Sequence, residues 1–367
     1  MRKIGLIATN LAGSGAEKIV LHLAEMFEKQ GDEVHIFLLE DVISYDVKGA
    51  KIHVLSKDRS FFKLFKNFGD KLLAKKLKST MSTIEQDGKK FDLLLSNLPA
   101  ADRVAVQANL PNTYYVIHTS YSMEIEEFRK RGKWSRAEKK ERLYHRLYKG
   151  KNLVAVSQGI KEDLDKMSID YYSCKVIYNP FDFEAIREMA NKESAIKIEG
   201  EYLLSASAFR PVKRYDILLE AYSKLTDPPP LKLLCNSDPK LEKMIDELGI
   251  QDQVEILGFT KNPYPVIKNA KLLILSSERE GLPTVLIEAL ILDTAIVSTN
   301  CISGPSEILT EDLKYYLSRV NDIEDLFSKI RKALNNYPLI IDSTVEKFNT
   351  KNIYKKYQRL VKNDDAK

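Results

Sequence analysis

Residues 276–290 read Ser-Ser-Glu-Arg-Glu-Gly-Leu-Pro-Thr-Val-Leu-Ile-Glu-Ala-Leu and follow the apolar run 272–276. The short apolar run is typical of a buried strand, and the apolar stretch after Pro283 is typical of a helix. Glu280 is therefore expected on a strand-to-helix turn, and Glu288 inside the helix. Because open α/β sheets bind ligands at the carboxyl ends of their strands, this stretch predicts a ligand site.

The same pattern recurs along the chain and predicts an α/β fold with parallel sheets. Helical patterns lie between several short apolar runs, as in Ile19, Leu23, Met26 and Phe27. Strands that alternate with helices are typical of parallel sheets. The other runs that we interpret as strands are 4–9, 34–39, 51–55, 91–96, 114–118, 153–157, 203–208, 231–235, 254–259 and 295–299.

The length of 367 residues predicts two domains, because a single hydrophobic core rarely grows to this size. Asn179-Pro180 is a turn signal that ends one run of strands, and a charged helical connector follows it. We therefore place the domains at 1–180 and 181–349. An amphipathic pattern over 350–362 predicts a last helix, which can pack on either domain and can complete the first.

Composition excludes several classes of protein. Cys174, Cys235 and Cys301 are scattered and show no spacing typical of a disulfide framework or a zinc site. The apolar stretch 4–8 is too short for a signal peptide, and no run reaches the roughly 18 apolar residues of a membrane-spanning helix. We expect a cytosolic protein that is soluble or peripheral to a membrane.

Positive charge is concentrated in the first half of the chain. Residues 1–180 hold 31 Lys and Arg against 23 Asp and Glu, whereas the rest holds 26 against 29. Two stretches dominate, 57–78 and 129–151, and aromatic residues are interleaved with the basic ones in both. An anionic membrane attracts each nearby basic side chain by about 1 kcal/mol, so both stretches are candidates for membrane contact. The alternative is an ordinary solvated helix face; RNA binding is disfavoured because no nucleic-acid module is present.

The carboxylates of Glu280 and Glu288 suit a ligand with several hydroxyl groups. Each carboxylate accepts hydrogen bonds from neighbouring hydroxyls, as sugars and ribose present them. The backbone N–H groups after Gly281 open a helix and can hold an anion. The alternative is structural: Glu280 caps the helix and Glu288 forms a buried pair.

The loop Gly13-Ser14-Gly15 follows the first predicted strand and precedes a helix. Its backbone amides can approach phosphate or acceptor oxygens closely, or it can be only a tight turn. A dinucleotide site is disfavoured, because the third glycine of that fingerprint would fall at Lys18. His118 ends the predicted strand 114–118 and is expected at the crevice side of its sheet.

At these residues the chain resembles the retaining glycosyltransferases of family 4, which have the GT-B fold of two facing Rossmann-like domains with a cleft between them. The resemblance runs from about residue 5 to 310. It rests on Gly13–Lys18, Val156-Ser157, Asn179-Pro180, Lys213 in the segment 209–216, Glu280 and Glu288 in Glu-Gly-Leu-Pro-x(4)-Glu, and Gly304–Glu307.

The resemblance implies a role for each matched residue. Glu280 contacts the transferred sugar, Glu288 binds the ribose hydroxyls, and Lys213 holds the diphosphate. His118 bonds the donor sugar, so Lys213, Glu280 and His118 form the expected catalytic set. No metal or other cofactor is expected, because cations and helix N-termini stabilise the leaving diphosphate. The remaining expected donor contacts are Arg210, Gly258, Gly281, Leu282, Pro283 and Thr284.

The chain departs from the family pattern at Ala208, where an arginine is usual. Arg210 lies two residues further along, and we expect it to reach the same phosphates. The alternative is that Arg210 is a solvated loop charge.

The leading hypothesis is retaining transfer of a hexose or N-acetylhexosamine from a nucleoside-diphosphate sugar, with UDP favoured, to a lipid-linked saccharide. The first domain is expected to bind the acceptor and the second the nucleotide sugar. This activity would serve cell-surface polysaccharide or lipopolysaccharide synthesis at the inner face of the cytoplasmic membrane. The alternatives are the same fold with a soluble acceptor, and a catalytically idle nucleotide- or saccharide-binding protein.

Overall fold

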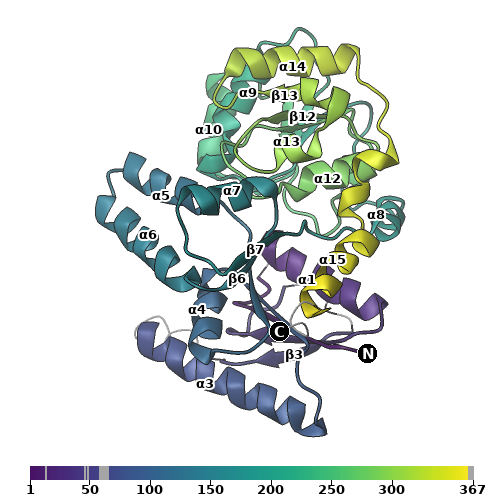
Figure 1. Ribbon diagram of the computed structural model, residues 1–367. Coiled ribbons are helices and arrows are strands. Elements are labelled where there is room, and N and C mark those ends of the chain that lie inside the picture. Colours follow the sequence, from purple (N-terminus) through teal and green to yellow (C-terminus); the bar gives the residue numbers. More distant parts are fainter. Residues whose placement is uncertain (13–14, 45–46, 48, 58–65, 363–367) are drawn as a thin grey trace. The chain divides into compact units, whose positions relative to one another are not determined.

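The computed structural model describes residues 1–12, 15–44, 47, 49–57 and 66–362. The chain divides into two compact units: unit 1 comprises residues 1–180 and 350–367, and unit 2 comprises residues 181–349. Each unit is built around a parallel sheet covered by helices (Figure 1). The predicted α/β class with Rossmann-like parallel sheets is confirmed.

Within the described residues, unit 1 contains a seven-stranded sheet in the order β3-β2-β1-β4-β5-β6-β7. All neighbouring strands are parallel. Every residue of the central strands β1, β4 and β5 is buried, as expected of strands that are covered on both faces. The strands are β1 (Lys3–Ala8), β2 (Glu33–Leu38), β3 (Lys51–Val54), β4 (Leu93–Asn97), β5 (Thr113–Ile117), β6 (Asn152–Ala155) and β7 (Ser173–Val176).

The helices of unit 1 cover this sheet, and the C-terminal helix packs among them. In Figure 1, α15 lies beside α1. The Phe27 ring meets the rings of Tyr354 and Tyr357 edge-on, with centroids 6.0 and 5.6 Å away. The helices are α1 (Gly15–Lys29), α3 (Lys66–Ile84), α4 (Pro99–Ala108), α5 (Tyr121–Lys130), α6 (Trp134–Tyr148), α7 (Gln158–Lys166) and α15 (Thr350–Lys362).

Unit 2 contains a six-stranded parallel sheet in the order β10-β9-β8-β11-β12-β13. The strands are β8 (Leu203–Ser205), β9 (Leu231–Leu233), β10 (Val254–Ile256), β11 (Leu272–Leu275), β12 (Ile296–Thr299) and β13 (Leu317–Ser318). The main helices are α8 (Phe183–Ala190), α9 (Tyr215–Ser223), α10 (Pro239–Glu247), α11 (Tyr264–Lys268), α12 (Thr284–Ile291), α13 (Pro305–Ile308) and α14 (Ile323–Asn335). Leu218, Leu233 and Leu326 belong to a fully buried cluster between sheet and helices.

Both sheets reverse their strand order at one point. In unit 1 the reversal lies between β1 and β4, and in unit 2 it lies between β8 and β11. The loops that leave neighbouring strands at such a point run in opposite directions and leave a crevice at the carboxyl edge of the sheet. Ligand-binding residues are therefore expected in the loops after these four strands.

Candidate active site

Two loops meet at the strand-order reversal of unit 2. The loop after β8 contains the 3₁₀ turn η2 (Pro211–Lys213), and the loop after β11 runs from Ser276 to Pro283. Ser276 Oγ donates a hydrogen bond to the carbonyl oxygen of Lys213 at 2.7 Å, and the N–H of Glu278 donates to the carbonyl oxygen of Val212 at 2.8 Å. These two bonds fix the loops side by side.

Lys213 and Glu280 form an ion pair across the two loops. Lys213 Nζ lies 2.6 Å from Glu280 Oε1, and the two side chains are 22% and 12% exposed. Partial burial strengthens the attraction, because fewer water molecules screen the charges. Limited exposure also leaves both groups accessible to a ligand. The sequence predicted a role for each residue, and the structure brings the two side chains together.

The Glu280 loop rests on a second loop that follows β12. Ser303 Oγ donates a hydrogen bond to the carbonyl oxygen of Glu280 at 2.7 Å. Gly304 has a φ of 99°, and a Cβ there would lie 2.4 Å from Pro283 Cδ. Only glycine satisfies both constraints without moving the loop. The glycine of the predicted segment 304–307 therefore supports the backbone at Gly281, Leu282 and Pro283.

Glu288 lies on α12, which begins at Thr284 directly after this loop. The residue is only 4% exposed, and Tyr264 Oη donates to its Oε1 at 3.4 Å. Pro283 precedes the helix and provides no side-chain cap. The first N–H groups of a helix have no partner within the helix, so this end of α12 suits an anion.

Arg210 and Gly258 lie at the same edge of the sheet. The N–H of Lys213 donates a hydrogen bond to the carbonyl oxygen of Arg210 at 2.9 Å, but among the described residues the Arg210 side chain forms no hydrogen bond with Lys213 or Glu280. Arg210 precedes η2, is exposed, and makes no recorded ion pair in the part of the chain that the structure describes. Gly258 follows β10 with a φ of 78°, and a Cβ at this position would meet nothing within 4 Å. Glycine is thus favoured at 258 by backbone conformation rather than by close packing.

In unit 1, His118 follows β5 and contacts the end of β4. Its Nε2 lies 3.0 Å from Asn97 Oδ1. The Asn97 amide group donates to the carbonyl oxygens of Leu95 at 3.1 Å and Ile7 at 3.4 Å, so Oδ1 must face the histidine. His118 therefore carries its proton on Nε2, and Nδ1 is an acceptor. Burial lowers the pKa of His118 to about 4, which keeps the ring neutral at pH 7.

Asn97 is a further candidate site residue, which the sequence did not single out. It is fully buried at the end of β4, beside the strand-order reversal of unit 1. The same rule that selected Glu280 could have found it, because polar residues that end strands next to a reversal point are site candidates. The apolar run 91–96 was taken to end one residue earlier.

The glycine loop after β1 lies only partly in the described structure. Gly13 and Ser14 fall outside the described residues. Gly15 is the first residue of α1, and a Cβ there would meet nothing within 4 Å. Close packing against the described residues therefore does not explain glycine at 15.

The described residues contain no group of three or more His, Cys, Asp and Glu side chains that could hold a metal ion. The same part of the chain contains no helix that is both long and apolar enough to cross a membrane. The basic stretch 57–78 lies largely on α3, and residues 58–65 fall outside the described structure. The stretch 129–151 covers the end of α5 and all of α6, where Trp134 is 62% exposed.

Comparison with known proteins identifies the family. Residues 13–185 match the family model described as Glycosyltransferase Family 4, and residues 186–357 match the model described as Glycosyl transferases group 1. The chain belongs to glycosyltransferase family 4. It is a glycosyltransferase with the GT-B fold.

One relative of this glycosyltransferase is the N-acetylgalactosamine-N,N'-diacetylbacillosaminyl-diphospho-undecaprenol 4-alpha-N-acetylgalactosaminyltransferase of Campylobacter jejuni. It is 29% identical over 362 residues, which cover 92% of this chain and 93% of the relative. Among solved structures, sucrose-phosphate synthase from Thermosynechococcus elongatus has a TM-score of 0.79 at 16% identity, with full coverage of both chains. Anabaena Alr3699/HepE in complex with UDP and glucose has a TM-score of 0.69 at 16% identity, covering 99% of this chain and 100% of the other.

Proposed function

We propose that this glycosyltransferase transfers a hexose or N-acetylhexosamine from a UDP-sugar, with retention of the anomeric configuration, to a lipid-linked saccharide acceptor. Unit 2 binds the nucleotide sugar and unit 1 binds the acceptor. The observation that carries the proposal is the Lys213–Glu280 pair at the strand-order reversal of unit 2, one loop away from the buried Glu288.

The charges of this site match the charges and hydroxyls of the proposed donor. The ammonium group of Lys213 binds the diphosphate, and the exposed Arg210 adds a second cation from the same loop. Glu280 accepts hydrogen bonds from hydroxyls of the transferred sugar, and Glu288 accepts them from the ribose. Hydrogen bonds to charged groups contribute roughly 1.5–3 kcal/mol each, so these contacts account for substantial donor affinity.

The ion pair also has a consequence for donor binding. A diphosphate at Lys213 and a sugar hydroxyl at Glu280 engage the two groups that bind each other at 2.6 Å. Donor binding therefore exchanges one internal contact for two contacts with the ligand. A ligand with only the diphosphate, or only the sugar, breaks the Lys213–Glu280 contact but forms one of the two new contacts. It is therefore expected to bind more weakly than the complete nucleotide sugar.

The negative charge that develops during the reaction also suits the arrangement of cations at this site. As the bond between the sugar and the diphosphate breaks, negative charge grows on the leaving phosphate. Lys213, Arg210 and the N-terminus of α12 stabilise that charge, which lowers the barrier. The leaving phosphate accepts the proton of the acceptor hydroxyl on the same face, as front-side retaining displacement requires. His118 orients the donor sugar, and its neutral ring offers Nδ1 as an acceptor for a sugar hydroxyl.

Support for a lipid-linked acceptor comes from two sources. The Campylobacter jejuni relative is named for a diphospho-undecaprenol acceptor and is matched over nearly the full length of both chains. In addition, the basic stretches 57–78 and 129–151 suit contact with an anionic membrane surface. We place the enzyme in the cytoplasm, peripheral on the inner face of the membrane, in cell-surface polysaccharide or lipopolysaccharide synthesis.

The proposal is tested in two steps. A thermal-shift screen compares UDP-, GDP- and ADP-sugars, and we expect UDP-sugars to raise the unfolding temperature most, because ligand binding stabilises the folded state. Transfer is then measured to a saccharide linked to undecaprenyl diphosphate and to the same saccharide without the lipid. Preference for the lipid-linked form supports the proposal. Equal transfer to the free saccharide would assign a soluble acceptor, and the absence of a shift with every nucleotide sugar would contradict the donor site.

A further inference from the structure

A cavity of about 330 Å³ lies in unit 1 between α4, α5 and α6, and none of its lining residues belongs to the candidate active site. Five basic side chains line it: Arg103, Arg136, Lys139, Lys140 and Arg146. The other lining residues, Phe128 and Leu143, are apolar and partly buried. No acidic residue of the described structure lines the cavity.

Two of the five cations are already engaged by carboxylates outside the cavity. Arg103 Nε lies 2.8 Å from Asp70 Oδ2, and Lys140 Nζ lies 2.8 Å from Glu124 Oε1. Arg136, Lys139 and Arg146 have no recorded ion pair or hydrogen bond with any described residue. The three unengaged charges are exposed, and they lie on one face of α6 at spacings of three and seven residues.

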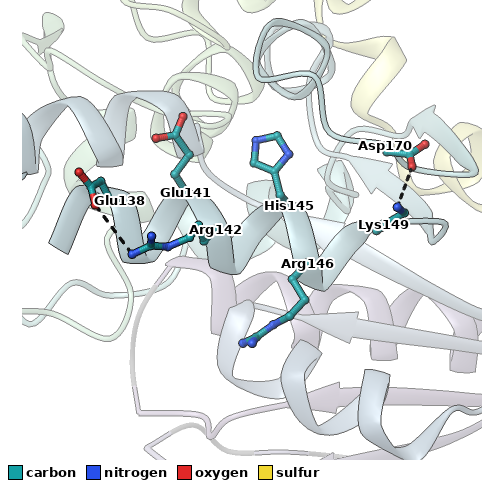
Figure 2. A pocket seen from close by; sticks show the side chains of 7 residues that line it. All are labelled: Glu138, Glu141, Arg142, His145, Arg146, Lys149 and Asp170. Carbon is teal, nitrogen blue, oxygen red and sulfur yellow. Dashed lines mark ion pairs between the residues drawn. The ribbon is translucent and has the colours of Figure 1, made fainter. Parts of the chain in front are cut away.

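The opposite side of α6 has a different character. A second hollow there is lined by Glu138, Glu141, Arg142, His145, Arg146, Lys149 and Asp170, so Arg146 lines both hollows. Arg142 faces Glu138 and Lys149 faces Asp170, both at 3.8 Å, so these charges are partly compensated. Figure 2 shows Glu141 and His145 on one side of the helix and Arg146 pointing to the other. Uncompensated positive charge is thus concentrated in the cavity beside α4 and α5.

The helix that carries these charges is firmly held. On its buried face, the ring of Tyr144 stacks on Tyr121 with a centroid distance of 3.8 Å. Tyr148 Oη donates to Asp102 Oδ2 at 2.7 Å, which ties α6 to α4. The cationic side chains therefore project from a rigid backbone, and the charge cluster exists before any ligand arrives.

We propose that this cavity binds a phosphate-bearing group. Phosphate oxygens accept charge-assisted hydrogen bonds from arginine and lysine, and arginine matches them with two parallel donors. The volume is at the lower end of ligand pockets, which suits one phosphate or diphosphate group rather than a whole nucleotide sugar. Phe128 and Leu143 provide apolar contact for the carbon atoms next to the phosphate.

The phosphate can belong to a lipid or to a soluble molecule, and the chemistry that binds it is the same. Trp134 at the start of α6 is exposed, and tryptophan is favoured where a protein meets the membrane interface. Only the choice of a lipid as the source of the phosphate rests on the membrane contact proposed for residues 129–151. The proposal does not depend on the donor site of unit 2.

The test compares two double variants that each remove two positive charges from the α6 segment. Arg136→Ala/Lys139→Ala removes unengaged cations that line only the cavity, and Arg142→Ala/Lys149→Ala removes cations from the opposite side. One arm titrates inorganic pyrophosphate by calorimetry in a chain that also carries Lys213→Ala, so that the donor site is weakened and contributes equally to both variants. The other arm measures flotation with vesicles of phosphatidylglycerol and phosphatidylcholine against phosphatidylcholine alone.

We expect the cavity variant to bind its probe at least about 10-fold more weakly than the opposite-side variant, because each lost charge-assisted contact is worth roughly that factor. If the cavity variant loses only pyrophosphate affinity, the natural ligand is a soluble phosphate compound. If it loses binding to phosphatidylglycerol vesicles, the ligand is a phospholipid. Equal binding by both variants in both arms would overturn the proposal. Binding of a UDP-sugar by the chain with Lys213 intact is measured separately, so a failed donor site and a failed cavity give different results.

Discussion

Lys213 Nζ and Glu280 Oε1 lie 2.6 Å apart, although the residues are 67 positions apart in the sequence. The contact depends on two neighbouring parallel strands, because β8 and β11 deliver their loops to the same edge of the sheet. Each residue of the pair is proposed to contact a different part of the donor. The pair therefore links recognition of the diphosphate to recognition of the sugar.

Replacement of Lys213 by alanine is expected to weaken UDP binding by about 10- to 100-fold, because a charge-assisted contact with the diphosphate is lost. It also leaves the Glu280 carboxylate without its cation, which repels the phosphates. Calorimetric titration with UDP measures the effect. Lys271→Ala is the matched control, since Lys271 pairs with Glu201 before the start of β11, at the other end of that strand. Equal affinities for the two variants would remove Lys213 from the phosphate site.

Arg210 is expected to take over the phosphate contact of the arginine that is missing at Ala208. Arg210→Ala should lower the affinity for UDP by roughly 10-fold, with the uridine and ribose contacts unaffected. The double variant Ala208→Arg/Arg210→Ala should recover most of the loss, because it restores the arginine at the usual family position. If Arg210→Ala binds UDP as tightly as the unchanged protein, Arg210 is only a solvated loop charge.

Asn97 is predicted to hold His118 in the tautomer that transfer requires. The low pKa of about 4 keeps His118 neutral, so kcat/KM should show no loss from this group between pH 7 and pH 5. Asn97→Asp places a carboxylate beside Nε2, which favours the protonated ring and raises its pKa. Protonation then occupies Nδ1, and the acid limb of kcat/KM should move to higher pH. Profiles of the two proteins that coincide from pH 5 to pH 8 would contradict this role.

Gly304 is predicted to be needed for the shape of the donor loop. Gly304→Ala introduces both an unfavourable φ and a contact of 2.4 Å with Pro283 Cδ, and should destabilise unit 2 by about 1–3 kcal/mol. Gly249→Ala separates the two causes, because Gly249 has a φ of 65° but nothing within 4 Å of the added Cβ. Denaturant unfolding should show the larger loss for Gly304→Ala, together with a raised KM for the donor. Equal stability losses would show that the contact with Pro283 is easily relieved.

Much of the fold was predictable because the strands are short and apolar, and those at the centre of each sheet are buried. Each of the eleven apolar runs predicted as strands overlaps one strand of the structure. The predicted set did not include β7 and β13, the last strands of the two sheets. The Ser-Cys-Lys-Val segment of β7 is only partly buried, and β13 has two residues. An edge strand has a neighbour on one side only, so its sequence needs less apolar character and gives a weaker pattern.

The candidate site was predictable where a single residue could be singled out from the sequence alone. Glu280 and Glu288 stood out by residue type and by their place on a predicted strand-to-helix segment, and Lys213 was found through the resemblance to the family. The supporting contacts of Ser276, Ser303 and Asn97 did not stand out, because common polar residues acquire a role only when the fold brings distant segments together. The cationic cavity was visible in the sequence only as a basic stretch. Its definition required the packing of α6 against α4 and α5.

The central claim is that Glu280 acts on the transferred sugar while Lys213 holds the diphosphate, and Glu280→Gln tests it most directly. The measurement pairs the rate of sugar transfer with the affinity for UDP, and Glu278→Gln on the same loop is the control. We predict a loss in kcat of about 100-fold or more for Glu280→Gln, as for other removed electrostatic contacts to a transition state. UDP affinity should be equal or higher, because Lys213 is released from its ion pair. Transfer by Glu280→Gln at the rate of Glu278→Gln would contradict the account.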